Sequence, residues 1–248
     1  MKTLQRVTEA EVIAEFLRNE FYQDEFHHDR NRFEPLVFEA NLANEAENAL
    51  RRALLFRRRG HMWRELPADT QWWEVEIEDC DLNLIRVFPR AQWRQMAGDD
   101  FLLRGIVQRI RDRQFSPKVN DFVAKVQALS YRLRIEPISS CVLLIGVAEN
   151  QPFTILEGNH RLTAALLAGP HLLRTRFRVL VGLSPKMTES CWYETSFANL
   201  WRYGKNRLKH LLYDEDADVE RVLEAIEQER AAPLEEPAPV RKAIPGSK

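Results

Sequence analysis

Hydrophobic residues recur at helical spacing through the first sixty residues of the chain. The periodicity predicts an amphipathic helix over residues 8–22 and a longer helix over residues 41–59. We expect Gly60 to end the longer helix, because glycine is the residue most often found just past a helix. A polar, charged connection over residues 23–33 separates the two. The N-terminal quarter of the chain is therefore predicted to be helical.

The pattern changes to short apolar runs after residue 70. These runs predict four strands, at residues 72–78, 140–149, 152–156 and 176–183. Asn150–Gln151 is expected to form the turn that joins the second and third strands as a hairpin. Two helical stretches, over about 100–113 and 117–132, lie between the first strand and the hairpin. This order predicts an α/β (α+β) protein in which helices flank a small mixed sheet.

The C-terminal quarter returns to helical spacing and then loses any pattern. A crowded aromatic segment, residues 192–203, leads into a predicted helix that we expect to pack on the core through Phe197, Leu200, Trp201, Leu208 and Leu212. A last helix is predicted over residues 216–229. Residues 231–248 are rich in proline and alanine and are expected to be disordered.

Composition narrows the class of protein. Hydrophobic residues make up 45% of the 248 residues, enough for a core, and the formal net charge is −1. No apolar run approaches the roughly 18 residues that would span a bilayer, so we predict no membrane association. Acids interrupt the N-terminal apolar stretch, unlike a signal peptide, and the three cysteines are few and far apart; both features predict a cytoplasmic protein.

Charge is unevenly distributed despite the near-zero total. Residues 51–64 hold six arginines, one histidine and no acid, whereas residues 214–236 hold ten acids. The basic stretch is interpreted either as a solvated helix face or as a surface for an anionic ligand or nucleic acid. DNA is therefore a candidate partner but not the favoured one, because a dedicated DNA-binding domain is usually strongly basic.

Candidate chemistry is concentrated at residues 155–161, Ile-Leu-Glu-Gly-Asn-His-Arg. An apolar strand meets a turn at Gly158, where glycine permits a positive φ or close approach of a ligand. A helix follows directly, and the free N–H groups of its first turn attract anions. His160 and Arg161 in that turn add hydrogen-bond donors and charge, which predicts a phosphate site. Asn159 is expected to cap the helix or contact the ligand.

A purely structural interpretation of the same residues remains open. Glu157 and Arg161 would then form a local ion pair, and His160 would be a structural hydrogen-bonding residue. No metal site is predicted, because the chain has no His-Glu-x-x-His pattern and His27–His28 lies in a polar segment typical of a surface.

The run from Glu157 to Arg161, followed by the small pair Ala164–Ala165, resembles the signature of the ParB/sulfiredoxin-like superfamily. Strand, hairpin, signature helix and strand is also that superfamily's core order. The resemblance covers about residues 73–184. It implies a ParB/sulfiredoxin-like core with a helical N-terminal region at 1–72, a helical C-terminal region at 185–230 and a tail at 231–248.

The closest motif within the superfamily is that of the free serine kinases, which carry an Asp-Gly-His-His-Arg-like sequence. Sulfiredoxins use a cysteine where this chain has Asn159, so reductase activity is not expected. The kinase resemblance implies that Glu157 and His160 are catalytic and that Gly158, Asn159, His160 and Arg161 bind a nucleotide (ATP, ADP or CTP), with Mg²⁺ as a further candidate. Such kinases take a base from the first strand, where Glu76 and Glu78 remain alternatives.

The leading functional hypothesis is binding of a nucleotide or phosphorylated small molecule, with phosphoryl transfer or nucleotide hydrolysis on an unknown small substrate. A second hypothesis is a DNA-associated ParB-like or nuclease-like protein that uses residues 51–64 on the nucleic-acid backbone. A third is a non-catalytic scaffold whose aromatic segment, residues 192–203, docks a partner. The substrate, the nucleotide base and the oligomeric state are not encoded in any pattern of the sequence.

Overall fold

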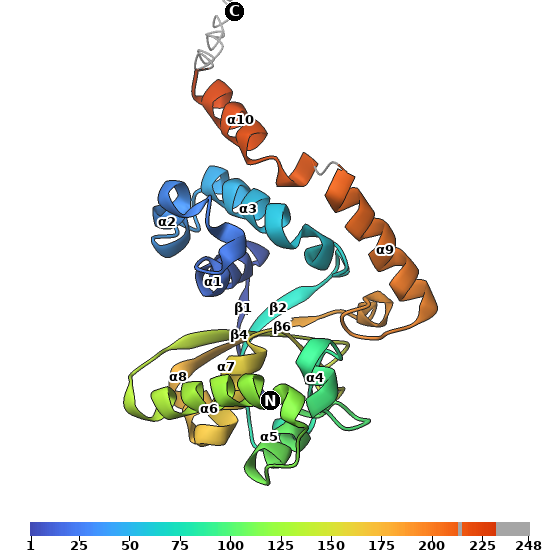
Figure 1. Cartoon of the computed structure of the whole chain (residues 1–248). Coiled ribbons are helices and arrows are strands. Elements are labelled where there is room, and N and C mark those ends of the chain that lie inside the picture. The colour runs from blue at the N-terminus through green and yellow to red at the C-terminus, as the bar shows by residue number, and fades with distance from the viewer. Residues whose placement is uncertain (213–214, 232–248) are drawn as a thin grey trace, which may run out of the picture.

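The computed structural model describes residues 1–212 and 215–231 (Figure 1). A six-stranded mixed sheet lies at its centre, with the strands in the order β1-β2-β6-β4-β5-β3. The predicted fold class, a mixed sheet with flanking helices, is confirmed. The strands are β1 (Lys2–Val7), β2 (Gln71–Glu76), β3 (Ile85–Val87), β4 (Ser140–Gly146), β5 (Phe153–Glu157) and β6 (Phe177–Leu183).

The central pair of strands, β4 and β6, is parallel and mostly buried. β4 and β6 pair in parallel register from Ser140 opposite Phe177 to Gly146 opposite Leu183, and β5 folds back antiparallel on β4. Both faces of β4 contact hydrophobic side chains, since Val142 and Leu144 belong to one core and Leu143 to the other. This double burial explains why β4 is a continuous apolar run in the sequence.

Helices cover both faces of the sheet, as Figure 1 shows. The layer on one side consists of α1 (Glu9–Glu20), α2 (Arg30–Phe38) and α3 (Glu45–Trp63). The layer on the other consists of α4 (Ala91–Met96), α5 (Leu103–Arg111), α6 (Asn120–Ile135), α7 (Asn159–Ala168) and α8 (His171–Arg176). Two helices near the C-terminus, α9 (Phe197–Leu212) and α10 (Val219–Ala231), lie along the α3 side of the molecule.

The structure differs from the sequence-based expectations at several places. Four elements, α2, β3, α4 and α8, have no counterpart among the predicted ones, and three further differences concern β1, Gly60 and α9. The chain begins with a strand, β1, which the sequence pattern missed because residues 2–6 are all exposed and give no alternation. Gly60 does not end α3, which continues to Trp63. The indole of Trp63 stacks on Trp72 of the sheet, with 6.0 Å between ring centroids. We infer that this burial offsets the cost of about 1 kcal/mol for a glycine inside a helix.

The third difference concerns α9. The predicted helix forms, but the prediction that its apolar residues pack on the core is wrong: Phe197 is 86% exposed and Trp201 is 63% exposed. The disordered tail predicted at 231–248 lies, from residue 232 onward, outside the described residues. No helix in the described part of the chain is long and apolar enough to span a membrane.

Candidate functional site

The predicted signature lies where β5 passes into α7. Glu157 is the last residue of β5, and Gly158 adopts a φ of +99° before the helix begins at Asn159. A Cβ at position 158 would lie 3.0 Å from Cγ2 of Val142 on the neighbouring strand. Positive φ and close packing therefore both favour glycine here. Gly158 has no side chain to cap α7, so the first N–H groups of the helix stay available at its tip.

Arg161 is held by protein groups rather than directed into an open cleft. Its guanidinium forms an ion pair with the Glu157 carboxylate and donates hydrogen bonds to Oδ1 of Asn19 and, at 3.0 Å, to Oγ of Ser140. The structure thus contains the local ion pair between Glu157 and Arg161 that the structural interpretation of the sequence predicted. Because Asn19 belongs to α1 and Ser140 to β4, Arg161 ties the first turn of α7 to both.

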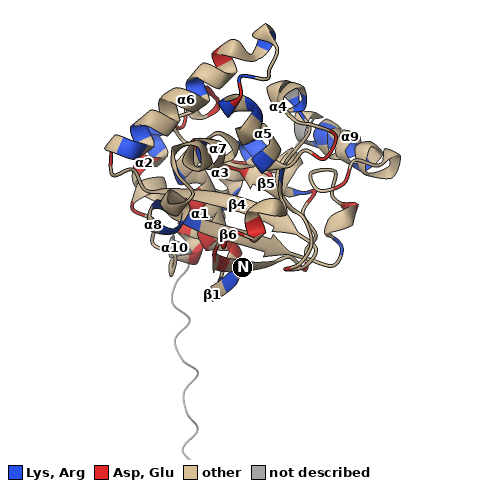
Figure 2. Ribbon diagram, turned by 90° about the horizontal axis from the view of Figure 1, so that it is seen from below, with Lys and Arg blue, Asp and Glu red and all other residues tan. Residues whose placement is uncertain are grey.

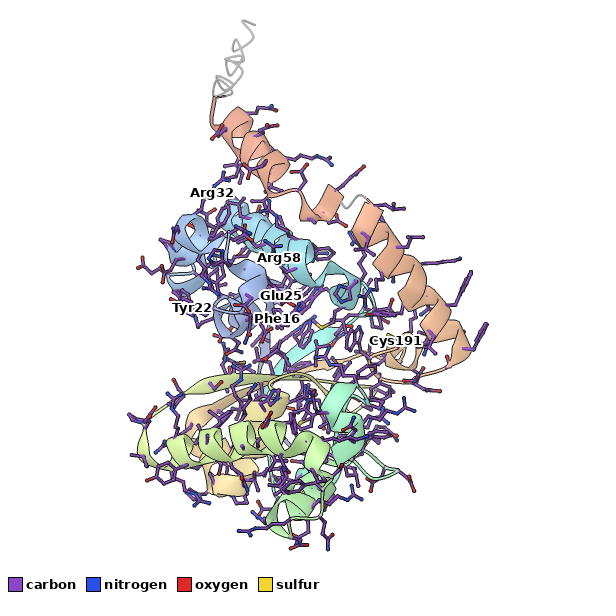
Figure 3. The ribbon with its side chains drawn as sticks, viewed as in Figure 1. Phe16, Tyr22, Glu25, Arg32, Arg58 and Cys191 are labelled. Atoms are coloured by element: carbon purple, nitrogen blue, oxygen red, sulfur yellow. The ribbon has the colours of Figure 1, made fainter. Side chains whose placement is uncertain are left out.

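The tip of α7 opens into a cavity of about 520 Å³ between the two helical layers. A second hollow of about 390 Å³ adjoins it and shares the residues from Glu157 to His160. Figure 3 shows Phe16 and Glu25, two residues of the cavity wall, in the layer of α1 to α3. The cavity is lined by Phe16, Glu20, Gln23, Asp24, Glu25, Arg59, His61, Met62, Arg90, Trp93, Leu156, Glu157, Gly158, Asn159, His160 and Trp192.

Two buried polar atoms that belong to cavity-lining residues have no hydrogen-bond partner among the described residues. They are Oδ1 of Asn159 and Nε1 of Trp192, and the Trp192 side chain as a whole is almost completely buried. A buried polar atom without a partner costs about 1–3 kcal/mol. An acceptor and a donor left unsatisfied on the wall of one cavity are consistent with a ligand that supplies the complementary groups.

His160 stands at the mouth of the cavity against an aromatic wall. Its ring lies 5.1 Å from the Trp93 ring and 5.2 Å from the Phe122 ring, measured between centroids. The His160 side chain is partly exposed, but the neighbouring rings shield one side of the imidazole from water. This partial desolvation, together with the nearby Arg161 charge, lowers the pKa of His160. The imidazole is therefore neutral at pH 7 and can accept a proton.

Glu157 faces a second carboxylate, that of Glu20 on α1. Burial is the main cause that raises the pKa of Glu157 to about 7, and the adjacent Glu20 adds to the rise, whereas Arg161 opposes it. Two carboxyls in such proximity hold one proton more tightly than either would alone. The Glu157 carboxyl is therefore about half-protonated near neutral pH, the condition that general acid–base catalysis requires.

Two arginines supply positive charge to the cavity. Arg59 is engaged by Glu20, at 3.2 Å, and by Glu25. The guanidinium of Arg90 has no hydrogen bond or ion pair to any residue in the described part of the chain, although its backbone N–H donates to the carbonyl of Phe88 at 2.8 Å. The guanidinium lies over the Trp192 ring, 5.4 Å from the centroid. Arg90 is thus the cation available to an anionic ligand.

The base predicted from the first strand is not brought to this cavity. Glu76 lies on β2, which β6 and β4 separate from β5, a distance of roughly 14 Å at ordinary strand spacing. Its carboxylate lies 3.9 Å from Nζ of Lys2. Glu78, the alternative, pairs with the N-terminal amine together with Asp81.

Sequence analysis missed Glu20 and Arg90, which complete the cavity, because each comes from a separate segment with no motif of its own. Trp192 fell within the aromatic segment, residues 192–203, but that segment was expected to dock a partner. Arg59 did fall within the basic stretch that the sequence singled out.

The described residues contain one group of side chains close enough to share a metal ion, Glu78, Cys80 and Asp81. Its two carboxylates already bind the N-terminal amine, and it lies outside the cavity. His27 and His28 stack edge-on against each other, and the neighbouring Asp29 binds Arg57 and Arg58.

The basic stretch, residues 51–64, is neutralised within the protein. Each of its six arginines forms an ion pair with a carboxylate, and Arg51 is completely buried. Figure 2 shows basic residues spread over several helices instead of gathered on one face. The pairs are Arg51–Glu47, Arg52–Glu9, Arg57–Asp29, Arg58–Asp29, Arg59 with Glu20 and Glu25, and Arg64–Asp216.

Comparison with known proteins leaves the cavity as the main guide to function. No protein-family model, curated protein or solved structure matches the chain.

Proposed function

We propose that the cavity at the tip of α7 binds a nucleotide or another phosphorylated small molecule and catalyses phosphoryl transfer or nucleotide hydrolysis. One observation carries the proposal: unpartnered hydrogen-bonding groups converge on a single cavity. They are the Asn159 amide oxygen, the Trp192 indole N–H and the Arg90 guanidinium, beside the free N–H groups of the α7 tip. A phosphate would accept hydrogen bonds from the donors, and a ligand hydroxyl or amine would donate to Asn159.

The order of elements around the cavity supports a ParB/sulfiredoxin-like core. The antiparallel hairpin of β4 and β5 leads directly into α7, and β6 then returns parallel to β4. This is the sequence of elements that the resemblance of residues 157–161 implies. The proposal therefore includes membership of that superfamily.

In the proposed mechanism, Arg90 and the N-terminal turn of α7 hold the phosphate. Positioning and charge neutralisation are the main requirements of phosphoryl transfer, and both come from fixed groups here. Arg161 acts as a positioning residue, because its bonds to Asn19, Ser140 and Glu157 fix the first turn of α7 against α1 and β4.

A proton acceptor for the attacking hydroxyl or water lies in the same cavity. Glu157, beside Glu20, can take up the proton from the attacking oxygen as its bond to phosphorus forms. The bond from phosphorus to the leaving oxygen breaks at the same time, and the remaining nucleotide or other leaving group departs with the electron pair of that bond. Neutral His160 is a second proton acceptor. Mg²⁺, where present, would neutralise phosphate charge. It is usually held by one or two carboxylates with phosphate oxygens and water, and Glu20 and Asp24 on the cavity wall would supply these carboxylates.

The DNA-associated alternative gains no support, since every arginine of residues 51–64 already has an acidic partner. One observation supports a scaffold function, namely the exposed apolar face of α9. An enzyme can carry such a face as well, so this observation does not favour a scaffold over an enzyme.

The test is a thermal-shift panel of ATP, ADP and CTP, each with and without Mg²⁺, on the wild type, Arg90→Ala and Arg94→Ala. Arg94 is exposed on the neighbouring α4 and lies outside the cavity, so it controls for loss of charge. A ligand at 100 to 1,000 times its Kd should stabilise the wild type by about 3–4 kcal/mol.

We expect Arg90→Ala to lose most of that stabilisation and Arg94→Ala to retain it. A phosphate-release assay on the active pair of protein and nucleotide then measures hydrolysis. No response to any nucleotide, or equal responses from all three proteins, would contradict the proposed site.

A further inference from the structure

α9 presents its apolar face to solvent. Six large hydrophobic side chains form one stripe along the helix with exposed fractions between 50% and 86%. Figure 3 shows the side chains of α9 standing out from the body of the protein. The stripe consists of Phe197, Leu200, Trp201, Leu208, Leu211 and Leu212. A contiguous exposed patch of this kind marks an interaction surface.

The opposite, polar face of α9 attaches the helix to the rest of the protein. The Asn199 amide donates hydrogen bonds of 2.8 Å to the carbonyls of Thr188 and Glu194, and the Asn206 amide binds Glu65. Tyr203 packs edge-on against Trp192. Because these contacts fix the helix by its polar side, the apolar side cannot turn inward without breaking them, and no segment within residues 1–212 and 215–231 covers it.

The stripe is nearly symmetrical about Gly204. Phe197 and Leu211 lie seven residues before and after this glycine, and Leu200 and Leu208 lie four residues before and after it. At 100° per residue, Gly204 falls in the middle of the stripe. A Cβ placed on Gly204 would meet nothing within 4 Å, so the backbone is bare at the centre of the apolar surface.

We propose that a second copy of the chain covers this face, with two α9 helices crossing antiparallel at Gly204 about a two-fold axis. Each residue then meets the one equally far on the other side of the glycine: Phe197 against Leu211 and Leu200 against Leu208. A self-complementary patch of this kind is what an isologous dimer requires.

The exposed area agrees with the same partner. α9 contains Arg202, Lys205, Arg207 and Lys209 and no acid, so the contact between two copies depends on the apolar stripe and not on charge complementarity. The six side chains expose on the order of 700 Å² per copy, close to the roughly 800 Å² per partner of a stable interface.

The test measures mass and cross-linking of the full chain in a Cys80→Ser background, since Cys80 is exposed and the other two cysteines are buried. Light scattering should give a dimer for this parent and a monomer for Leu200→Glu/Leu208→Glu. Both leucines are at least half exposed, so the variant should keep its circular dichroism spectrum and melting temperature.

A short bismaleimide should link Gly204→Cys to its own copy within the dimer. Lys209→Cys, exposed on α9 away from the stripe, should link at least tenfold more slowly, because the two copies of residue 209 would be about 15 Å apart along the helix axis. Equal linking at 204 and 209, or a monomeric mass for the parent, overturns the proposal. A monomer whose α9 binds anionic lipid vesicles would assign the face to a membrane surface instead.

Discussion

The Glu157 carboxylate and the Arg161 guanidinium form an ion pair across the first turn of α7, and both side chains are largely shielded from solvent. The residue whose charge would be the obvious phosphate ligand is thereby used to hold the helix in place. In the proposed function, Arg90 instead supplies the charge for an anion, and the fold brings it to the same cavity from the segment before α4.

Arg161→Ala should destabilise the protein by about 2–4 kcal/mol, because it leaves the Glu157 carboxyl buried without a counter-charge. Glu157→Gln should cost less, since a neutral amide needs no counter-charge and Arg161 keeps its bonds to Asn19 and Ser140. Urea denaturation at pH 7 measures both. Equal losses in the two single variants would show that the ion pair is not buried as described.

Stability should depend on pH through Glu157. Its pKa is raised to about 7 in the folded protein against an ordinary value of 4.5, so the folded state keeps a proton that the unfolded state has released. The contribution is therefore fully present below pH 4.5 and is lost as pH rises toward 7. The total is on the order of 2–3 kcal/mol.

The measurement is the difference in unfolding free energy between wild type and Glu157→Gln from pH 4.5 to 8, in which other titrating groups cancel. The wild type should lose stability relative to the variant as pH increases. Parallel curves would mean that Glu157 titrates normally.

Gly158→Ala should destabilise the fold by about 1–2 kcal/mol, because a φ of +99° is strained for alanine and the new Cβ would crowd Val142. Gly105→Ala is the matched control. Gly105 lies inside α5, and a Cβ there would meet nothing within 4 Å, so this change should stabilise by up to about 1 kcal/mol. Thermal denaturation of both variants gives the comparison, and a stabilised Gly158→Ala protein would refute the strain argument.

Substitution of two neighbouring arginines of α3, Arg51 and Arg52, should change the free energy of unfolding by very different amounts. Arg51 is completely buried, donating to the carbonyls of Leu36 and Asn41 at 3.0 and 2.9 Å, so Arg51→Met should cost about 3 kcal/mol or more. Arg52 forms an exposed ion pair with Glu9, and Arg52→Ala should change stability by less than about 1 kcal/mol. Denaturant titration distinguishes the two outcomes.

The paired arginines also predict weak DNA binding. Fluorescence anisotropy with a labelled duplex at 50 mM salt should give a Kd no tighter than about 10⁻⁵ M, and Arg57→Ala/Arg58→Ala should not weaken it further, because both side chains already bind Asp29. Tight binding that this double variant abolishes would restore the DNA-associated hypothesis.

The central strands and the turn at Gly158 could be predicted from the sequence, because these features depend on residues that are close together along the chain. Apolar runs specified β4, β5 and β6, and the glycine between an apolar strand and a small-residue helix specified the junction. The N-cap of α1 at Thr8 is equally local, since its hydroxyl accepts a hydrogen bond from the N–H of Glu11. Such features need no knowledge of distant segments.

Distant segments decide the rest. Glu20, Arg90 and Trp192 meet at one cavity only because the sheet order places their segments around the end of β5. Glu76 fails to reach it because β6 and β4 intervene. The sequence determined that α9 has an apolar stripe, because helical periodicity places its hydrophobic residues on one face. It did not determine whether that face points to the core or to solvent. The contacts of Asn199 and Asn206 with the rest of the protein decide this, and they turn the apolar face to solvent.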